Sequence, residues 1–145
     1  MNLCLAWSSR SEFRSLPDVR LEGRLNQHGM PIVDIRVEGF PGPLSVLVDT
    51  GFNGELIISE EQARGAGILY LPGHVYPAMV ANAQRPGFYP GAGYVSWFVE
   101  RRGVDIHVLP GPTPQEPWTP MIGTRLLANS RLEIDFPNRT ILITR

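Results

Sequence analysis

Residues 44–58 read Leu-Ser-Val-Leu-Val-Asp-Thr-Gly-Phe-Asn-Gly-Glu-Leu-Ile-Ile, and this stretch decides the fold. The apolar run 44–48 predicts a strand buried on both faces, and Leu56-Ile57-Ile58 predicts a second one. Between them, Gly51-Phe52-Asn53-Gly54 supplies turn residues. A carboxylate such as Asp49 is costly to bury at the end of a strand unless it faces a polar cleft or a partner. Asp49 is therefore a candidate functional residue, although an ordinary turn aspartate has the same flanking pattern.

The rest of the chain also favours short strands joined by turns. It holds 15 Gly and 14 Pro, which is typical of an all-β domain. Ser59 followed by Gln62 has the form of a capping box, so we expect a short helix there, and a second helical patch follows at 124–128. Alternating or apolar patterns predict strands within a hairpin at 21–37, in two arms at 75–80 and 94–99, and at 104–108, 132–136 and 140–144.

Composition excludes several classes of function. The formal net charge is −1 and no basic block is present, which argues against a nucleic-acid partner. No stretch is long enough to span a membrane, so we expect no membrane partner. Cys4 is the only cysteine, which fits a reducing, cytoplasmic location. His28, His74 and His107 lack metal-ligand spacing, so neither a metal nor a cofactor is expected. We expect residues 1–19 to be an N-terminal extension and 20–145 to form one domain.

A second motif lies at 121–127. Met121-Ile122-Gly123 opens the second helical patch, and a strand containing Ile134-Asp135-Phe136 follows. Val-Leu-Val-Asp-Thr-Gly at 46–51 and Ile-Gly-Thr-Arg-Leu-Leu at 122–127 together resemble the two signatures of the retropepsin-like (clan AA) aspartic proteases, most closely the small bacterial type. The resemblance covers roughly residues 20–145. It implies a closed β-barrel or sandwich with one or two short helices and a flap hairpin.

The resemblance also implies roles for individual residues. Asp49 would be the catalytic carboxylate, Thr50 would hydrogen-bond across a dimer axis, and Gly51 would allow close approach of the backbone. Ile122 and Gly123 would form the floor under the catalytic turn. The substrate-binding residues that it implies are Phe52, Asn53, Asn82, Ala83 and Gln84. The flap tip is expected within 81–87, with 89–93 as the second candidate.

The chemistry of such a site needs two carboxylates that share a water molecule, one ionised and one protonated. The chain has a single Asp-Thr-Gly triplet, and a solvated surface explains its other aspartates. The expected activity, endopeptidase cleavage of a peptide or protein substrate, therefore requires an obligate homodimer that pairs two copies of Asp49.

Phe52 departs from the family pattern. Many relatives carry Ala, Ser or Thr directly after the triplet, and a hydroxyl there can hydrogen-bond the catalytic carboxylate. Phe52 cannot do so, and packing beneath the turn is its expected role, with a specificity pocket as the other possibility. Two alternatives to an autonomous enzyme follow: a non-catalytic dimeric peptide-binding or assembly module with the same fold, and an accessory processing domain of a larger assembly.

Overall fold

The computed structural model describes residues 20–77, 87–115 and 118–145. Its strands are β1 (Arg20–Leu25), β2 (Pro31–Val37), β3 (Leu44–Val48), β4 (Leu56–Ser59), β5 (Leu69–Tyr70), β6 (Tyr76–Pro77), β7 (Gly87–Trp97), β8 (Glu100–Leu109), β9 (Met121–Ile122), β10 (Arg131–Asp135) and β11 (Thr140–Thr144). Its helices are α2 (Glu60–Gly65) and α3 (Thr124–Leu127). Strands dominate the described residues, so the predicted all-β class with one or two short helices is confirmed.

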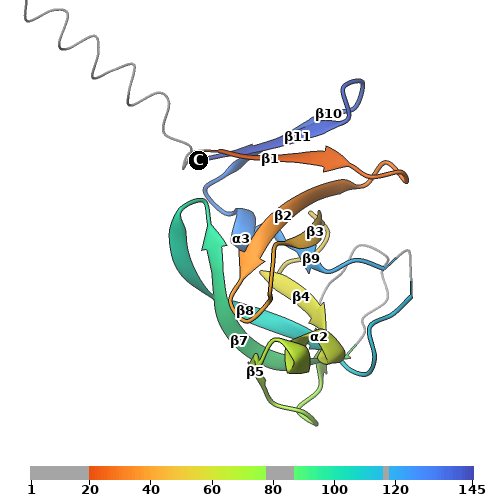
Figure 1. The fold of residues 1–145 in the computed structure, drawn as a ribbon, viewed down its shortest axis with the longest axis vertical. Helices are drawn as coiled ribbons and strands as arrows, with labels where there is room; N and C mark the ends of the chain where they lie inside the picture. Colours follow the sequence, from red (N-terminus) through yellow and green to blue (C-terminus); the bar gives the residue numbers. More distant parts are fainter. Residues whose placement is uncertain (1–19, 78–86, 116–117) are drawn as a thin grey trace, which may run out of the picture.

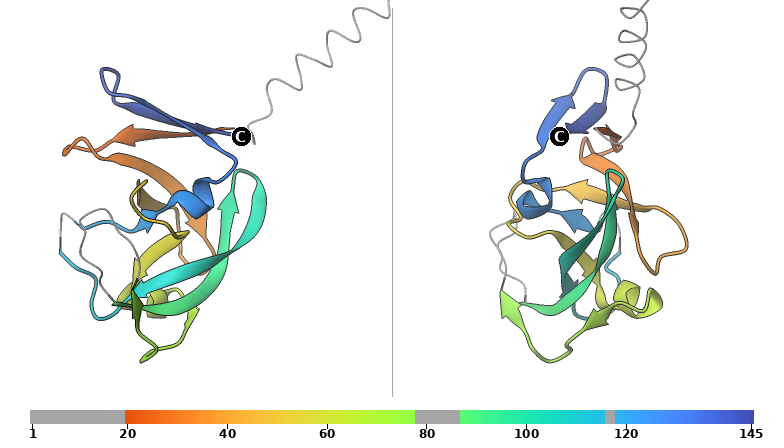
Figure 2. Two further views of the ribbon diagram at one scale, coloured as in Figure 1. Left: turned by 180° about the vertical axis from the view of Figure 1, so that it is seen from behind. Right: turned by 90° about the vertical axis from the view of Figure 1, so that its left-hand side faces the viewer.

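Six strands form a closed ring of hydrogen-bonded neighbours. Around the ring, β2 pairs with β3, β3 with β9, β9 with β4, β4 with β8, β8 with β7, and β7 again with β2. Figures 1 and 2 show these strands wrapped around one interior, with β10, β11 and β1 as a separate layer across one end. The pairs β3–β9 and β4–β8 are parallel, whereas the other pairs of the ring are antiparallel.

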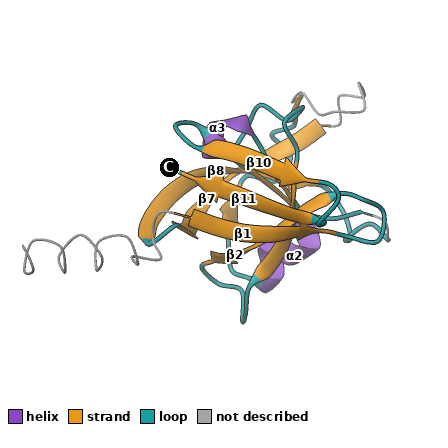
Figure 3. Ribbon diagram, turned by 90° about the horizontal axis from the view of Figure 1, so that it is seen from above, coloured by secondary structure: helices purple, strands orange, loops and turns teal. Residues whose placement is uncertain are grey.

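The strand β1 takes part in two pairings. Residues 21–37 form the expected hairpin, because β1 pairs antiparallel with β2 at Arg24↔Ile32 and Leu25↔Pro31, across a turn in which the Gly29 N–H donates to the Asn26 carbonyl oxygen at 2.9 Å. The sequence did not predict the second and longer pairing of β1, along five positions with β11, from Arg20↔Thr144 to Arg24↔Thr140. Figure 3 looks down on the layer of β10, β11 and β1. The alternation of apolar and polar residues predicts which face of a strand is buried, but it does not name the strand's partner.

The interior of the ring holds the main core, which is almost entirely aliphatic. Alternate residues of each strand point inward, as the pattern of Val33, Ile35 and Val37 predicted. These side chains meet Val46, Ile58 and others from the remaining strands in one contiguous cluster. Complete burial of one such side chain stabilises the fold by about 1.5–3 kcal/mol.

The two short helices begin where the sequence predicts. Ser59 caps α2, because its Oγ accepts the Gln62 N–H at 3.0 Å while the Gln62 side chain accepts the Ser59 N–H at 3.0 Å. The capping box is thus confirmed.

In the described part of the chain, no helix is long and apolar enough to cross a membrane.

The predicted arms of the flap pair differently from the expectation. Residues 94–97 belong to β7 and pair with β8, for example Tyr94 with Gly103, rather than with 75–77, the described part of the first arm. The strand that faces β6 is the start of β7, through Tyr76↔Phe88 and Pro77↔Gly87. The second candidate for the flap tip, 89–93, is therefore wrong, because it lies inside β7 and is paired with β8. Most of the first candidate, 81–87, lies outside the described residues.

Candidate active site

Asp49 lies where β3 ends, on the face of that strand opposite the main core. Val46 and Val48 are buried in the core, so Leu47 and Asp49 project to the other face. The Asp49 N–H donates to the Ile122 carbonyl oxygen at 2.9 Å and extends the β3–β9 pairing by one residue. The Asp49 Oδ1 accepts the Gly51 N–H at 2.8 Å. The carboxylate is half-buried, while Thr50 and Gly51 beside it are exposed.

A floor beneath this turn is built from the second sequence motif. The Thr124 N–H donates to the Phe52 carbonyl oxygen at 2.9 Å, and the Arg125 N–H donates to the Gly54 carbonyl oxygen at 3.1 Å. The Gly123 N–H completes the set by donating to the Glu55 carbonyl oxygen at 3.2 Å. The start of α3 thus holds the backbone that follows Asp49.

Gly123 is required at this floor for lack of space. A Cβ atom there would lie 2.5 Å from both the carbonyl oxygen and Cδ2 of Phe52, and 2.6 Å from the Gly54 carbonyl oxygen. Two of these three atoms belong to the backbone, so the contact cannot be relieved by rotation of a side chain. The glycine of the second motif is therefore a packing requirement of the turn itself.

The side chain of Phe52 is buried behind the turn. It is 0% exposed and packs with Ile57 and Phe88 in a second apolar cluster, separate from the main core. The ring of His107 contacts Phe52 edge-on, with ring centroids 5.0 Å apart and an interplanar angle of 86°. We call Phe52, Ile57, Phe88 and His107 the turn cluster. Phe52 is therefore unavailable to a substrate in this conformation and packs beneath the turn.

Sequence reasoning missed His107, which was considered only as a metal ligand. It is 8% exposed, and its Nδ1 is buried without a hydrogen-bond partner among the described residues. Burial lowers the pKa of His107, and the nearby Asp105 carboxylate opposes this by raising it. The available signal was the strand pattern, because His107 alternates with Ile106 and Val108 of the main core and must face the other side.

An ion pair between Glu55 and Arg102 was also missed. The Glu55 carboxylate is buried, accepts Arg102 Nη2 at 3.0 Å and accepts the Asp105 N–H at 3.0 Å. Arg102 also donates to the carbonyl oxygens of Arg125 and Leu126. The pair therefore links the start of β4, the β7–β8 hairpin and α3, the three segments around the turn.

A pocket of about 560 Å³ lies beside the strand that carries Asp49. Its apolar lining consists of Met30, Ile32, Leu47, Trp118 and Met121. Leu47 and Met121 are partners in the β3–β9 pairing, and Leu47 shares a face of β3 with Asp49. The volume is ordinary for a pocket that holds a small ligand or a side chain.

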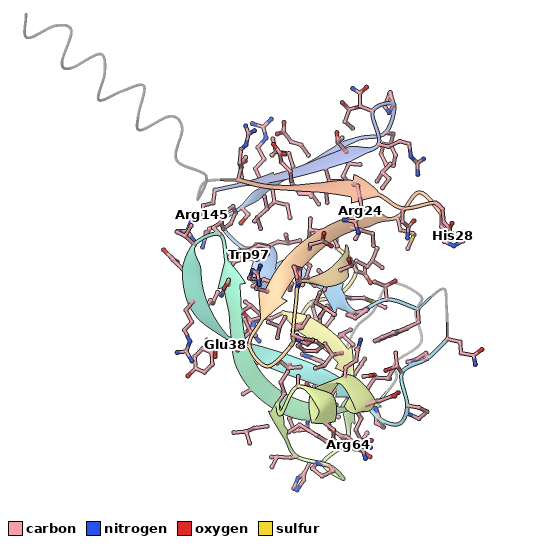
Figure 4. The ribbon with its side chains drawn as sticks, viewed as in Figure 1. Arg24, His28, Glu38, Arg64, Trp97 and Arg145 are labelled. Atoms are coloured by element: carbon pink, nitrogen blue, oxygen red, sulfur yellow. The ribbon has the colours of Figure 1, made fainter. Side chains whose placement is uncertain are left out.

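A second pocket of about 580 Å³ adjoins the first and shares five lining residues with it: Asn26, His28, Ile32, Trp118 and Thr119. It continues toward Arg24 and Ser45, which are more polar. Figure 4 shows Arg24 along β1 and His28 at the end of the β1–β2 loop, on the side of the molecule where β9 lies. Together the two pockets form a groove that is apolar at the end nearest β9.

The structure brings together the predicted catalytic and supporting residues Asp49, Thr50, Gly51, Ile122 and Gly123. Asn53 is exposed on the same turn. The predicted substrate-binding residues Asn82, Ala83 and Gln84 lie outside the described residues. Within 20–77, 87–115 and 118–145, no group of three or more His, Cys, Asp or Glu side chains is arranged to hold a metal ion.

The fold is similar to the crystal structure of a retropepsin-like aspartic protease from Rickettsia conorii. The TM-score is 0.56 at 17% sequence identity, over 86% of this chain and 87% of that one. No protein-family model matches the chain, and no curated protein sequence matches it significantly. At this identity the likeness shows the fold, so the retropepsin-like architecture implied by the two motifs is confirmed.

Proposed function

We propose that this chain is one half of a homodimeric aspartic endopeptidase in which two copies of Asp49 share a catalytic water. One observation carries the proposal: Asp49 lies at the end of a strand, above a floor that is hydrogen-bonded to the turn, while Thr50 and Gly51 beside it are exposed. Because its neighbours are exposed, the half-buried carboxylate of Asp49 can meet a second carboxylate and form a catalytic dyad. The second copy of the chain supplies the other half across a two-fold axis.

The reaction then needs no group beyond the two carboxylates and water. The ionised Asp49 takes a proton from the water as its oxygen attacks the peptide carbonyl carbon, and the protonated Asp49 of the partner subunit donates to the carbonyl oxygen. The tetrahedral intermediate collapses as Asp49 gives the proton it took from the water to the amide nitrogen, and the C–N bond breaks. The carboxylate of the partner subunit takes a proton back from a hydroxyl of the intermediate as the carbonyl forms again, so the dyad returns to one ionised and one protonated carboxyl. Two carboxylates this close cannot both be ionised, so the pair titrates in two separate steps.

The apolar pocket beside β3 supports a preference among substrates. Leu47 shares a face with Asp49, so a side chain adjacent to the cleaved bond lies over Leu47 and Met121. Trp118 and Met30 widen the same apolar surface. We therefore propose cleavage next to large apolar residues, with the more polar end of the groove, toward Arg24 and Ser45, taking residues farther along the peptide.

The outer edge of β10 supports association with a second copy, because no other strand of the described residues pairs with it. β10 ends the strand order of the sheet, and Ile134 and Phe136 are 37% and 64% exposed. Antiparallel pairing of two β10 strands about Glu133 places Arg131 opposite Asp135 of the partner subunit twice, and Leu132 opposite Ile134 of the partner subunit. Glu133 then faces its own copy, and Arg131 of the same strand, 3.1 Å from it, offsets this like charge. An unpaired edge of this kind is a template for another strand. Figures 1 and 2 put the turn of the β10–β11 hairpin on the same side of the molecule as β9.

The dimer is tested by exchanging these charges. Arg131→Glu should weaken self-association about tenfold, measured by sedimentation equilibrium, because it places two like-charged pairs across the axis. Arg131→Glu combined with Asp135→Arg should restore association, because opposite charges face each other again. An active dimer that neither variant affects would place the interface elsewhere.

The activity is tested by comparing the wild type with Asp49→Asn in a digest of a peptide library between pH 4 and 7. The wild type should cleave, and Asp49→Asn should lose cleavage by several orders of magnitude while keeping its fold. Asp105→Asn is the matched control, because Asp105 is exposed and pairs at the surface with Arg125 at 3.6 Å. Cleavage that survives Asp49→Asn, or that is absent from the wild type, would exclude this function.

A non-catalytic peptide-binding dimer is the second candidate. The observation that favours it is the phenylalanine at position 52, whose buried side chain has no hydroxyl to hydrogen-bond Asp49. The groove along β3 would bind a peptide in either case. This candidate predicts saturable peptide binding by the wild type without turnover, and equal binding by Asp49→Asn.

A further inference from the structure

The ring of His107 lies at the centre of a group of aromatic side chains behind the catalytic turn. Its centroid is 5.0 Å from the ring of Phe52, 5.2 Å from that of Tyr76 and 5.6 Å from that of Phe88. The contacts with Phe52 and Phe88 are edge-on, at interplanar angles of 86° and 76°. Such edge-on contacts are favourable and orient the rings that take part in them.

These contacts connect two parts of the site. Tyr76 and Phe88 are direct partners in the β6–β7 pairing, so they form one unit whose rings both contact His107. Phe52 belongs to the same turn as Asp49, and the Phe52 N–H donates to the Asp49 carbonyl oxygen at 3.1 Å. His107 is thus the single side chain, among the described residues, whose ring contacts the rings of Phe52, Tyr76 and Phe88.

The turn is held from two directions. On one side, the Phe52 carbonyl oxygen accepts the Thr124 N–H at 2.9 Å and Thr124 Oγ1 at 3.3 Å. On the other side, the Phe52 ring rests against His107. The fit is close, because a Cβ atom on Gly54 would lie 2.8 Å from His107 Cε1. A shift of the imidazole ring would therefore be passed to the backbone of the turn.

A histidine at position 107 makes the folded protein less stable than an aliphatic residue there would. A buried polar atom without a partner costs about 1–3 kcal/mol, and His107 Nδ1 is such an atom among the described residues. An aliphatic residue in β8 would avoid this cost. We infer that His107 is a positioning residue, whose ring supports Phe52 and thereby fixes the turn that carries Asp49. The inference rests on the proposed catalytic role of Asp49.

The experiment compares His107→Ala with Ile106→Ala. Ile106 is the preceding residue of β8, fully buried on the opposite face in the main core. Both variants should lower the melting temperature. His107→Ala should also lower kcat of the folded dimer at least about tenfold with little change in KM, because a displacement of about 1 Å at a reacting group can cost about a hundredfold. Ile106→Ala should leave kcat of the folded dimer unchanged.

Amide hydrogen exchange gives a readout that does not depend on activity. In His107→Ala, the amides of Phe52 and Thr124 should exchange at least about tenfold faster than in the wild type, because their hydrogen bonds to the turn open more often. In Ile106→Ala, they should change only as much as the rest of the sheet. If His107→Ala does not fold, His107→Phe keeps a ring at this place. It should retain the protection of the Phe52 and Thr124 amides, and His107→Leu, which has no ring, should lose it.

The outcomes separate this inference from the proposed function. Unchanged exchange at Phe52 and Thr124 in a folded variant without a ring at position 107 would overturn the inference, whatever the activity. Equal losses of kcat in His107→Ala and Ile106→Ala would do the same. Faster exchange in a protein whose wild type does not cleave peptides would leave the support of the turn intact and exclude catalysis by Asp49.

Discussion

The main core and the turn cluster lie on opposite faces of the same strand and do different work. In β4, Ile58 points into the aliphatic main core, while its neighbour Ile57 points into the turn cluster with Phe52. The main core is contiguous and draws on most of the strands of the ring. The turn cluster is small and aromatic, and it contains a buried imidazole. The difference indicates that one apolar cluster specifies the fold, whereas the other specifies the position of Asp49.

The largest expected effect on stability comes from truncating one buried side chain in each cluster. Phe52→Ala should cost about 3–5 kcal/mol of unfolding free energy and Ile58→Ala about 2–5 kcal/mol, because both side chains are fully buried. Denaturant unfolding measures both. Only Phe52→Ala should also lower the activity of the folded fraction. If Ile58→Ala lowers that activity as much, the two clusters do not have separate roles.

A smaller effect is expected from filling space beneath the turn. Gly123→Ala should cost about 1–3 kcal/mol through overpacking against Phe52 and the backbone, and it should lower activity as well. Gly103→Ala is the control, because a Cβ atom there would lie 3.5 Å from the Tyr94 ring, an ordinary contact. Thermal unfolding and peptide cleavage measure both variants. A Gly123→Ala protein with unchanged stability would show that the floor can relax.

The smallest expected effect is the pH dependence of stability that His107 contributes. Burial lowers the pKa of His107 below its ordinary value of 6.5; Asp105 and Glu55 raise it in part, and Arg125 lowers it. The ring of Tyr76 on β6 also faces this imidazole. The unfolded chain therefore binds a proton that the folded chain does not, so stability should fall as the pH drops below about 6.5. His107→Phe should lack this loss in denaturant unfolding.

The comparison is best made between about pH 5 and pH 7. Hydrogen bonds from Arg101 and Arg145 lower the pKa of Glu38 and Glu100, and the Gly111 N–H does so for Glu60, all from an ordinary value of 4.5. The stability that these carboxylates contribute is therefore lost only at lower pH. Identical slopes for the wild type and His107→Phe across this range would show that His107 does not titrate on unfolding.

Local patterns predicted most of the elements but few of their partners. The alternation of Val33, Ile35 and Val37 identified the buried face of β2, and Ser59 with Gln62 identified the start of α2. The pairing of β1 with β11, and of Tyr94 with Gly103 in β8, could not be derived in the same way. Pairing depends on residues far apart in the chain, and a period-two pattern is the same for any partner.

In the candidate site, too, the residues of a local motif were predicted from the sequence, whereas residues whose roles depend on distant contacts were not. Asp49, Thr50 and Gly51 are contiguous, so the Asp-Thr-Gly motif was enough to predict them as site residues. His107 and Glu55 were missed because their roles depend on burial, which brings the imidazole against Phe52 and the carboxylate against Arg102. The strand pattern of β8 indicates only that His107 faces away from the main core, and the sequence does not show which residues His107 and Glu55 contact.

The hydrogen bonds between the turn and α3 have a consequence for the order of folding. Phe52 and Thr124 are separated by 72 positions in the chain, so the turn after Asp49 cannot be fixed before the start of α3 has been synthesised. Such long-range contacts form late, because the intervening chain must first be ordered. We expect a chain that ends at residue 120 to leave the 49–54 segment open to limited proteolysis, and the addition of 121–145 to protect it. The turn that carries Asp49 would then become rigid only after the start of α3 has joined the fold.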